Sequence, residues 1–130
     1  MPGHLPGTEC NRHYFIHAKK LIPDFQQIFQ QYSGISHHML LQRCILEDLF
    51  ALITKNHKIE PWKAMVCCIN PYVRSSMSEY EIYFNFVFSR TDQVKIRLLK
   101  WANADEIYLN KLTEYKLQNY DYISCHAYCS

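Results

Sequence analysis

The segment SSMSEYEIYFNFVF, residues 75–88, constrains the fold most, because it combines a helical apolar pattern with two carboxylates. Its apolar residues recur at helical spacing on two faces, which predicts a largely buried helix over 76–90. An isolated carboxylate inside such a helix costs more free energy than packing returns. Glu79 and Glu81 therefore need a partner, a bound ligand or access to a cleft.

Two interpretations of this acidic pair are open from the residues alone. In the first, Ser76 or Ser78 forms a capping box with the nearby glutamates, which then suit the positive end of an ordinary core helix. In the second, the i, i+2 spacing puts Glu79 and Glu81 on nearly opposite sides of the helix. One carboxylate can then face a cleft while the other meets solvent or a cation.

The composition indicates one folded domain. The 130 residues are 48% hydrophobic and suffice for a single core. Lys and Arg total 14 against 12 Asp and Glu, so the net charge of +2 gives little electrostatic support for a nucleic-acid partner. No apolar run approaches the roughly 20 residues that cross a bilayer, so no membrane span is expected.

The cysteines favour a reducing compartment. The sequence has an adjacent pair and no C-x-x-C spacing, and it shows no secretory leader. We therefore expect a cytoplasmic protein with buried, reduced thiols rather than a disulfide framework. The cysteines are Cys10, Cys44, Cys67, Cys68, Cys125 and Cys129.

The rest of the pattern predicts an α/β chain that is rich in helix. We expect an irregular segment at 1–12, an extended segment at 13–17, helices at 20–32, 42–56, 61–69, 76–90 and 106–120, and strands at 35–41, 94–101 and 122–128. Strands this few and this separated do not make a complete sheet, so part of the sheet is expected to lie outside this chain.

Histidines offer possible ligands. His37 and His38 are adjacent, and neighbours in a strand point to opposite faces, so the pair is not a bidentate metal clamp. One core and one surface histidine is the simpler interpretation. His126 could ligate a metal with Cys129 nearby, although Cys125 and His126 face opposite ways in a regular strand.

Common catalytic motifs do not occur in the sequence. It has no G-x-G-x-x-G, P-loop, G-x-S-x-G, H-E-x-x-H or D-x-D pattern. Trp62 and Trp101 are interpreted as core anchors, which are commoner than sugar-stacking platforms.

Four segments, SGISHHML (33–40), SEYEIYFNFV (78–87), VKIRLLKW (94–101) and DYISCHAY (121–128), together resemble the C-terminal half of a glycosyltransferase-like family. This family of uncharacterised proteins occurs in bacteria and giant viruses. The resemblance covers 13–130 and implies a partial GT-A-like fold, with a nucleotide-sugar donor and a divalent cation, Mn²⁺ or Mg²⁺, in the complete enzyme. The family's N-terminal half holds the nucleotide and the metal, and this chain is expected to lack it.

The resemblance also implies roles for individual residues. An inverting transferase needs a carboxylate that takes the proton from the attacking hydroxyl, and Glu79 or Glu81 falls at that position. His126 falls where such folds supply a histidine to the metal or the diphosphate. The predicted substrate-binding residues are His37, His38, Trp62, Ser78 and Tyr80.

Three functions follow as hypotheses. The first is the acceptor-side half of a glycosyltransferase, inactive alone, which transfers a sugar to a glycan or another hydroxyl acceptor and pairs with an N-terminal partner chain or a second copy. The second is a non-catalytic protein-interaction module derived from a transferase, with an exposed sheet edge and apolar face. The third is a small nucleic-acid binder that uses Lys95, Arg97 and Lys100 on the strand predicted at 94–101.

Overall fold

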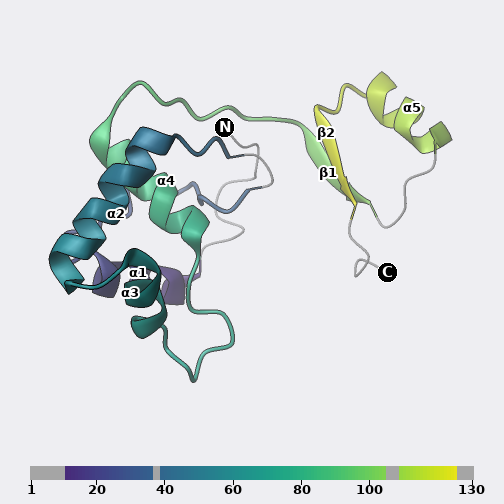
Figure 1. Ribbon diagram of the computed structural model, residues 1–130. Helices are drawn as coiled ribbons and strands as arrows, with labels where there is room; N and C mark the ends of the chain where they lie inside the picture. Colours follow the sequence, from purple (N-terminus) through teal and green to yellow (C-terminus); the bar gives the residue numbers. More distant parts are fainter. Residues whose placement is uncertain (1–10, 37–38, 105–108, 126–130) are drawn as a thin grey trace.

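The computed structural model describes residues 11–36, 39–104 and 109–125, and it has a mixed α/β structure that is rich in helix. The elements are α1 (Arg12–Leu21), α2 (Arg43–His57), α3 (Pro61–Cys67), α4 (Glu79–Arg90), β1 (Trp101–Ala104), α5 (Leu109–Leu117) and β2 (Tyr122–Cys125). Figure 1 shows α1 to α4 gathered in one group, with β1, α5 and β2 beyond an extended segment. The predicted α/β class is confirmed at this level.

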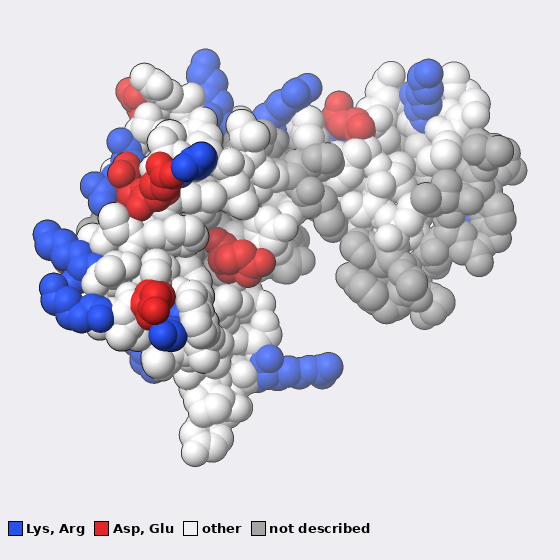
Figure 2. Space-filling model, in the orientation of Figure 1, with Lys and Arg blue, Asp and Glu red and all other residues white. Residues whose placement is uncertain are grey.

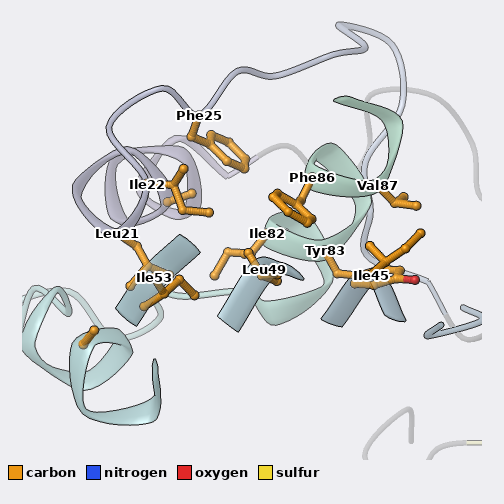
Figure 3. Close-up of a cluster of buried hydrophobic side chains, with 12 residues drawn as sticks. Leu21, Ile22, Phe25, Ile45, Leu49, Ile53, Ile82, Tyr83, Phe86 and Val87 are labelled. Atoms are coloured by element: carbon orange, nitrogen blue, oxygen red, sulfur yellow. The ribbon is translucent and has the colours of Figure 1, made fainter. Parts of the chain in front are cut away.

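The hydrophobic core lies where α1, α2 and α4 meet. Figure 3 shows the core side chains of these helices and of the turn after α1 directed toward one another. Every residue of α4 from Glu81 to Val87 is buried, which confirms the prediction of a helix enclosed on most sides. The core residues include Leu21, Ile22, Phe25, Ile45, Leu49, Ile53, Ile82, Tyr83, Phe86 and Val87.

The start of α1 corrects the extended segment predicted at 13–17. The Asn11 side chain accepts a hydrogen bond from the His13 N–H at 3.0 Å, which caps a helix that begins at Arg12. Three of its residues, His17, Ala18 and Leu21, are buried at helical spacing. This one-sided burial holds α1 against the core.

The end of α1 corrects the helix predicted at 20–32. Ile22 is extended, with φ of −130°, and it precedes Pro23. Because proline disfavours the helical conformation of the residue before it, the helix ends at Leu21. The described residues of 22–42 form no helix or strand, so the strand predicted at 35–41 is also wrong in its described part.

The helices predicted at 42–56, 61–69 and 106–120 are confirmed as α2, α3 and α5, with boundaries that differ by a few residues. Pro61 occupies the first turn of α3, where its missing N–H costs nothing. Helix α5 ends in a Schellman motif, because Asn119 has φ of 58° and the Tyr120 N–H donates to the Tyr115 carbonyl at 3.1 Å.

The two strands pair in parallel, from Trp101 with Tyr122 to Ala104 with Cys125. The strand predicted at 122–128 is confirmed as far as Cys125, and its remainder lies outside the described residues. The strand predicted at 94–101 is wrong, because β1 begins only at Trp101. The preceding residue, Lys100, donates from Nζ to the Gln118 carbonyl at 2.6 Å, so it belongs to this β-α-β unit and not to a basic strand face.

The thiols and the helix lengths bear on the predicted environment of the chain. Cys44, Cys67, Cys68 and Cys125 are free, but only Cys68 is even partly buried, so the expectation of buried thiols is wrong for the other three. Cys10 and Cys129 lie outside the described residues. Within the described part of the chain, no helix has the length and apolar character that a membrane crossing requires.

His17 makes the stability of the fold depend on pH. Its Nε2 lies 2.9 Å from the Met65 carbonyl, which can only accept, so the proton is on Nε2. The buried Nδ1 has no hydrogen-bond partner among the described residues. Burial and the charge of Lys20 lower the pKa of His17 below its usual 6.5, and the hydrogen bond to Met65 opposes this shift in part.

We expect the free energy of unfolding to fall as the pH drops below 6.5, the usual pKa of histidine. In that range the unfolded chain binds a proton at His17 and the folded chain does not, so acid favours unfolding. Urea denaturation at pH 7.5 and pH 5.5 should show a smaller loss in His17→Gln than in the wild type. The exposed His13→Gln is the control, and an equal loss in wild type and His17→Gln would contradict this role.

Candidate functional site

The first turn of α4 separates the two carboxylates. Ser78 is the N-cap, and its Oγ accepts a hydrogen bond from the Glu81 N–H at 3.3 Å. Ser78 is thus confirmed as the N-cap, but the Glu81 side chain bonds Ser33 and Asn85, so it does not form the reciprocal bond of a capping box. Ser76 Oγ instead accepts from the Asn70 N–H at 3.2 Å. Glu79 is exposed, and Glu81 is 0% exposed. The pair therefore divides into one surface carboxylate and one interior carboxylate.

Glu81 is held by polar partners inside the core. Ser33 Oγ donates to one carboxylate oxygen, and Asn85 Nδ2 lies 3.3 Å from the other. Asn85 also accepts from the Ile28 N–H at 2.8 Å through Oδ1. These bonds satisfy a buried carboxylate and fasten the 22–42 segment to α4. This environment does not fit the predicted role of Glu81 as a catalytic base, and it gives the residue a structural role.

The 22–42 segment lies unusually close to α4 at Gly34. A Cβ atom at this position would lie 2.5 Å from Phe84 Cβ and 2.5 Å from the Tyr80 carbonyl oxygen. Farther along, the Gln42 N–H donates to Tyr83 Oη at 2.8 Å. The polar and close contacts together explain how a segment without helix or strand keeps a defined path.

A groove opens between α2, α3 and α4 on the side of Glu79. It encloses a volume of about 540 Å³. Trp62 from α3 is 63% exposed, so it is not the core anchor that was predicted. The other predicted anchor, Trp101, is half-buried and stacks on Tyr122 with a centroid distance of 5.9 Å. The groove is lined by Met39, Leu41, Leu46, Leu49, Phe50, Pro61, Trp62, Met65, Glu79, Tyr80, Ile82 and Tyr83.

The structure brings together three of the predicted site residues. Glu79, Tyr80 and Trp62 line the groove, although Trp62 is distant from the other two in sequence. Ser78 does not line it, because its buried hydroxyl caps α4. His37, His38 and His126 lie outside the described residues.

Sequence reasoning missed the apolar wall of the groove. Phe50 of α2 and Leu41 are exposed at the groove, and neither was predicted as a site residue. The available signal was the width of the apolar stripe of α2, which extends beyond the buried residues Ile45, Leu49 and Ile53 to Leu46 and Phe50 at the groove.

The electrostatics of the groove depend on Glu79, which is the only charged side chain among the described residues that line it. Lys63 is nearby in sequence, but its Nζ pairs with Glu60 at 2.9 Å and lies 5.4 Å from the centroid of the Trp62 ring. Elsewhere, Figure 2 shows scattered acidic and basic side chains on this face, with several Lys and Arg side chains gathered along its left edge. The described residues contain no group of three His, Cys, Asp or Glu side chains that could hold a metal ion.

The groove can therefore contact an apolar surface along its walls and accept a hydrogen bond at one edge. An exposed tryptophan beside a carboxylate suits a ligand with both apolar and hydroxyl faces, such as a sugar or its aglycone. Comparison of the chain with protein-family models, with curated proteins and with solved structures finds no match.

Proposed function

We propose that this chain supplies the acceptor-binding side of a glycosyltransferase. The observation that carries the proposal is that Glu79, Tyr80 and Trp62 share one groove of ligand size. These three residues are among the site residues that the sequence resemblance implies, which left Glu79 and Glu81 as alternatives for the base. We choose Glu79 because it lines the groove, and we propose a cytoplasmic location for the reaction.

In the proposed reaction, Glu79 acts as a general base. Its carboxylate takes the proton of the acceptor hydroxyl while that oxygen attacks the anomeric carbon of the donor sugar. The bond from the anomeric carbon to the diphosphate breaks, and the nucleoside diphosphate leaves with the bonding electron pair. Trp62 and Tyr80 orient the acceptor by packing against its apolar face.

The nucleotide-sugar would be held by residues outside the described part of this chain. The described lining of the groove offers no Lys or Arg side chain for a diphosphate, and no described cluster suits Mn²⁺ or Mg²⁺. We therefore propose that an N-terminal half, carried on an additional segment or a partner chain, contributes the donor site. The sheet of β1 and β2 has only two described strands, and such a half could extend it.

The test is calorimetric titration with UDP-, GDP- and TDP-sugars plus Mn²⁺, first on the chain alone and then with any N-terminal half encoded upstream. We expect heat of binding only when both halves are present, and sugar transfer that falls at least about 100-fold in Glu79→Gln. Glu47→Gln, on the exposed surface of α2, is the matched control. If neither heat of binding nor sugar transfer is detected with both halves present, the transferase proposal is contradicted.

A second candidate function is a non-catalytic protein-interaction module. The observation that favours it is the apolar character of a groove formed by three helices, which also suits an amphipathic helix. In that case a partner protein would bind with unchanged affinity after Glu79→Gln, and no donor would bind in either titration.

A further inference from the structure

We infer that the acceptor is amphiphilic, with an apolar alkyl or aromatic body that fills the groove and a hydroxyl at the end that reaches Glu79. The reactivity of that hydroxyl rests on the proposed function. The apolar body is inferred independently from the walls of the groove.

The walls expose large apolar side chains that nothing in the described part of the chain covers. Leu41, Phe50 and Trp62 are each exposed although they line a concave site. They come from the segment before α2, from α2 itself and from α3, so one occupant can contact all of them. Burial of these apolar side chains against an apolar body is favourable, whereas a sugar ring without such a body would leave much of their surface in contact with water.

The polar end of the occupant follows from charge. A carboxylate can only accept hydrogen bonds, so the group that reaches Glu79 must donate one. The described walls carry no Lys or Arg, so a phosphate in the groove would face Glu79 without a counter-charge from them. The occupant is therefore not an anion, and the proposed function makes its donating group the acceptor hydroxyl. The negatively charged nucleotide-sugar would bind elsewhere.

The size of the groove indicates a small molecule. Its volume of about 540 Å³ falls within the range of about 300 to 1,000 Å³ that is usual for small-ligand sites. An alkyl glycoside matches this size, carries hydroxyl donors at one end and has an apolar chain at the other. Such glycosides are therefore suitable probes.

The protein itself provides a fluorescent reporter. It has two tryptophans, so Trp101→Phe leaves Trp62 as the sole source of tryptophan emission. Trp62 emission would be titrated with methyl, hexyl and octyl β-glucosides below their micelle concentrations. We expect affinity to rise about fourfold for each added methylene, which makes octyl glucoside about 15-fold tighter than hexyl glucoside. Equal affinity for the methyl and octyl compounds, or no response to either, would overturn the inference.

Calorimetry on variants tests whether the groove is the site. Trp62→Ala should weaken octyl glucoside binding at least about tenfold. Val66→Ala is the matched control, because Val66 is also on α3, is 59% exposed and does not line the groove. Equal losses in Trp62→Ala and Val66→Ala would overturn the assignment to the groove.

The inference and the proposed function can fail separately. Chain-length-dependent binding with no sugar transfer by the two assembled halves would support the amphiphilic site and contradict the transferase. Transfer with equal efficiency to acceptors that lack an apolar body would support the transferase and overturn the amphiphilic acceptor.

Discussion

Replacement of Glu81 by alanine is expected to lower the free energy of unfolding by about 3 kcal/mol or more. The change removes one hydrogen-bond partner of Ser33 and one acceptor of Asn85 Nδ2 inside the core. A buried polar group that loses its partner costs about 1–3 kcal/mol. The space left by a fully buried side chain adds a cavity term. Urea denaturation of the purified variant measures the total.

Glu79→Ala is the control for this prediction, because it removes a carboxylate from the same turn of the same helix. Glu79 is exposed, so its loss should cost only the helix-dipole contribution of about 0.3–1 kcal/mol. A stability loss in Glu81→Ala no larger than in Glu79→Ala would show that the interior network does not hold the fold.

Replacement of Gly34 by alanine is expected to destabilise the fold by at least about 2 kcal/mol. The added methyl group would meet Phe84 Cβ and the Tyr80 carbonyl oxygen, both at 2.5 Å. The Tyr80 oxygen is backbone in the first turn of α4 and cannot move aside by a rotamer change. The 22–42 segment would have to move away from α4 to make room, and overpacking of this type typically costs about 1–3 kcal/mol.

Thermal denaturation of Gly34→Ala measures this effect, with Gln31→Ala as the control. Gln31 is exposed in the same segment, so its replacement should change stability by less than about 0.5 kcal/mol. Comparable midpoints in Gly34→Ala and the wild type would contradict the close packing of this segment on α4.

Long helices with their own apolar stripe were predictable from sequence. In α2 the period of the apolar residues is regular, and in α4 an N-cap serine precedes an apolar run. The prediction of burial was also correct for α4, because apolar residues occur on every side of this helix. The local pattern therefore gave most of the helical core.

The path of 22–42 was not predictable, because tertiary contacts hold it. Its apolar residues have helical spacing, but Pro23 separates them from α1. The partners that fix the segment, Glu81 and Asn85, are distant in sequence. No local signal indicates that a helix will satisfy the polar groups of a remote segment.

The candidate site was predictable only in part, because it too depends on contacts between residues that are distant in sequence. The carboxylate pair was conspicuous, but its division into a structural Glu81 and an accessible Glu79 depends on Ser33 and on the position of α3. The basic residues at 95, 97 and 100 show the opposite case. The alternation of apolar and basic residues over 94–97 predicted a strand, whereas the described structure has no strand before Trp101.

The most direct test of the division between the two carboxylates is urea denaturation of Glu79→Gln and Glu81→Gln, each with and without octyl glucoside. Glutamine presents an amide N–H where Glu81 has an acceptor facing a donor, so Glu81→Gln should unfold at lower urea than the wild type. Glu79→Gln should lose only the helix-dipole contribution of about 0.3–1 kcal/mol without ligand, but it should gain less stability than the wild type when ligand is added. A wild-type midpoint in Glu81→Gln, together with full ligand stabilisation of Glu79→Gln, would contradict the division.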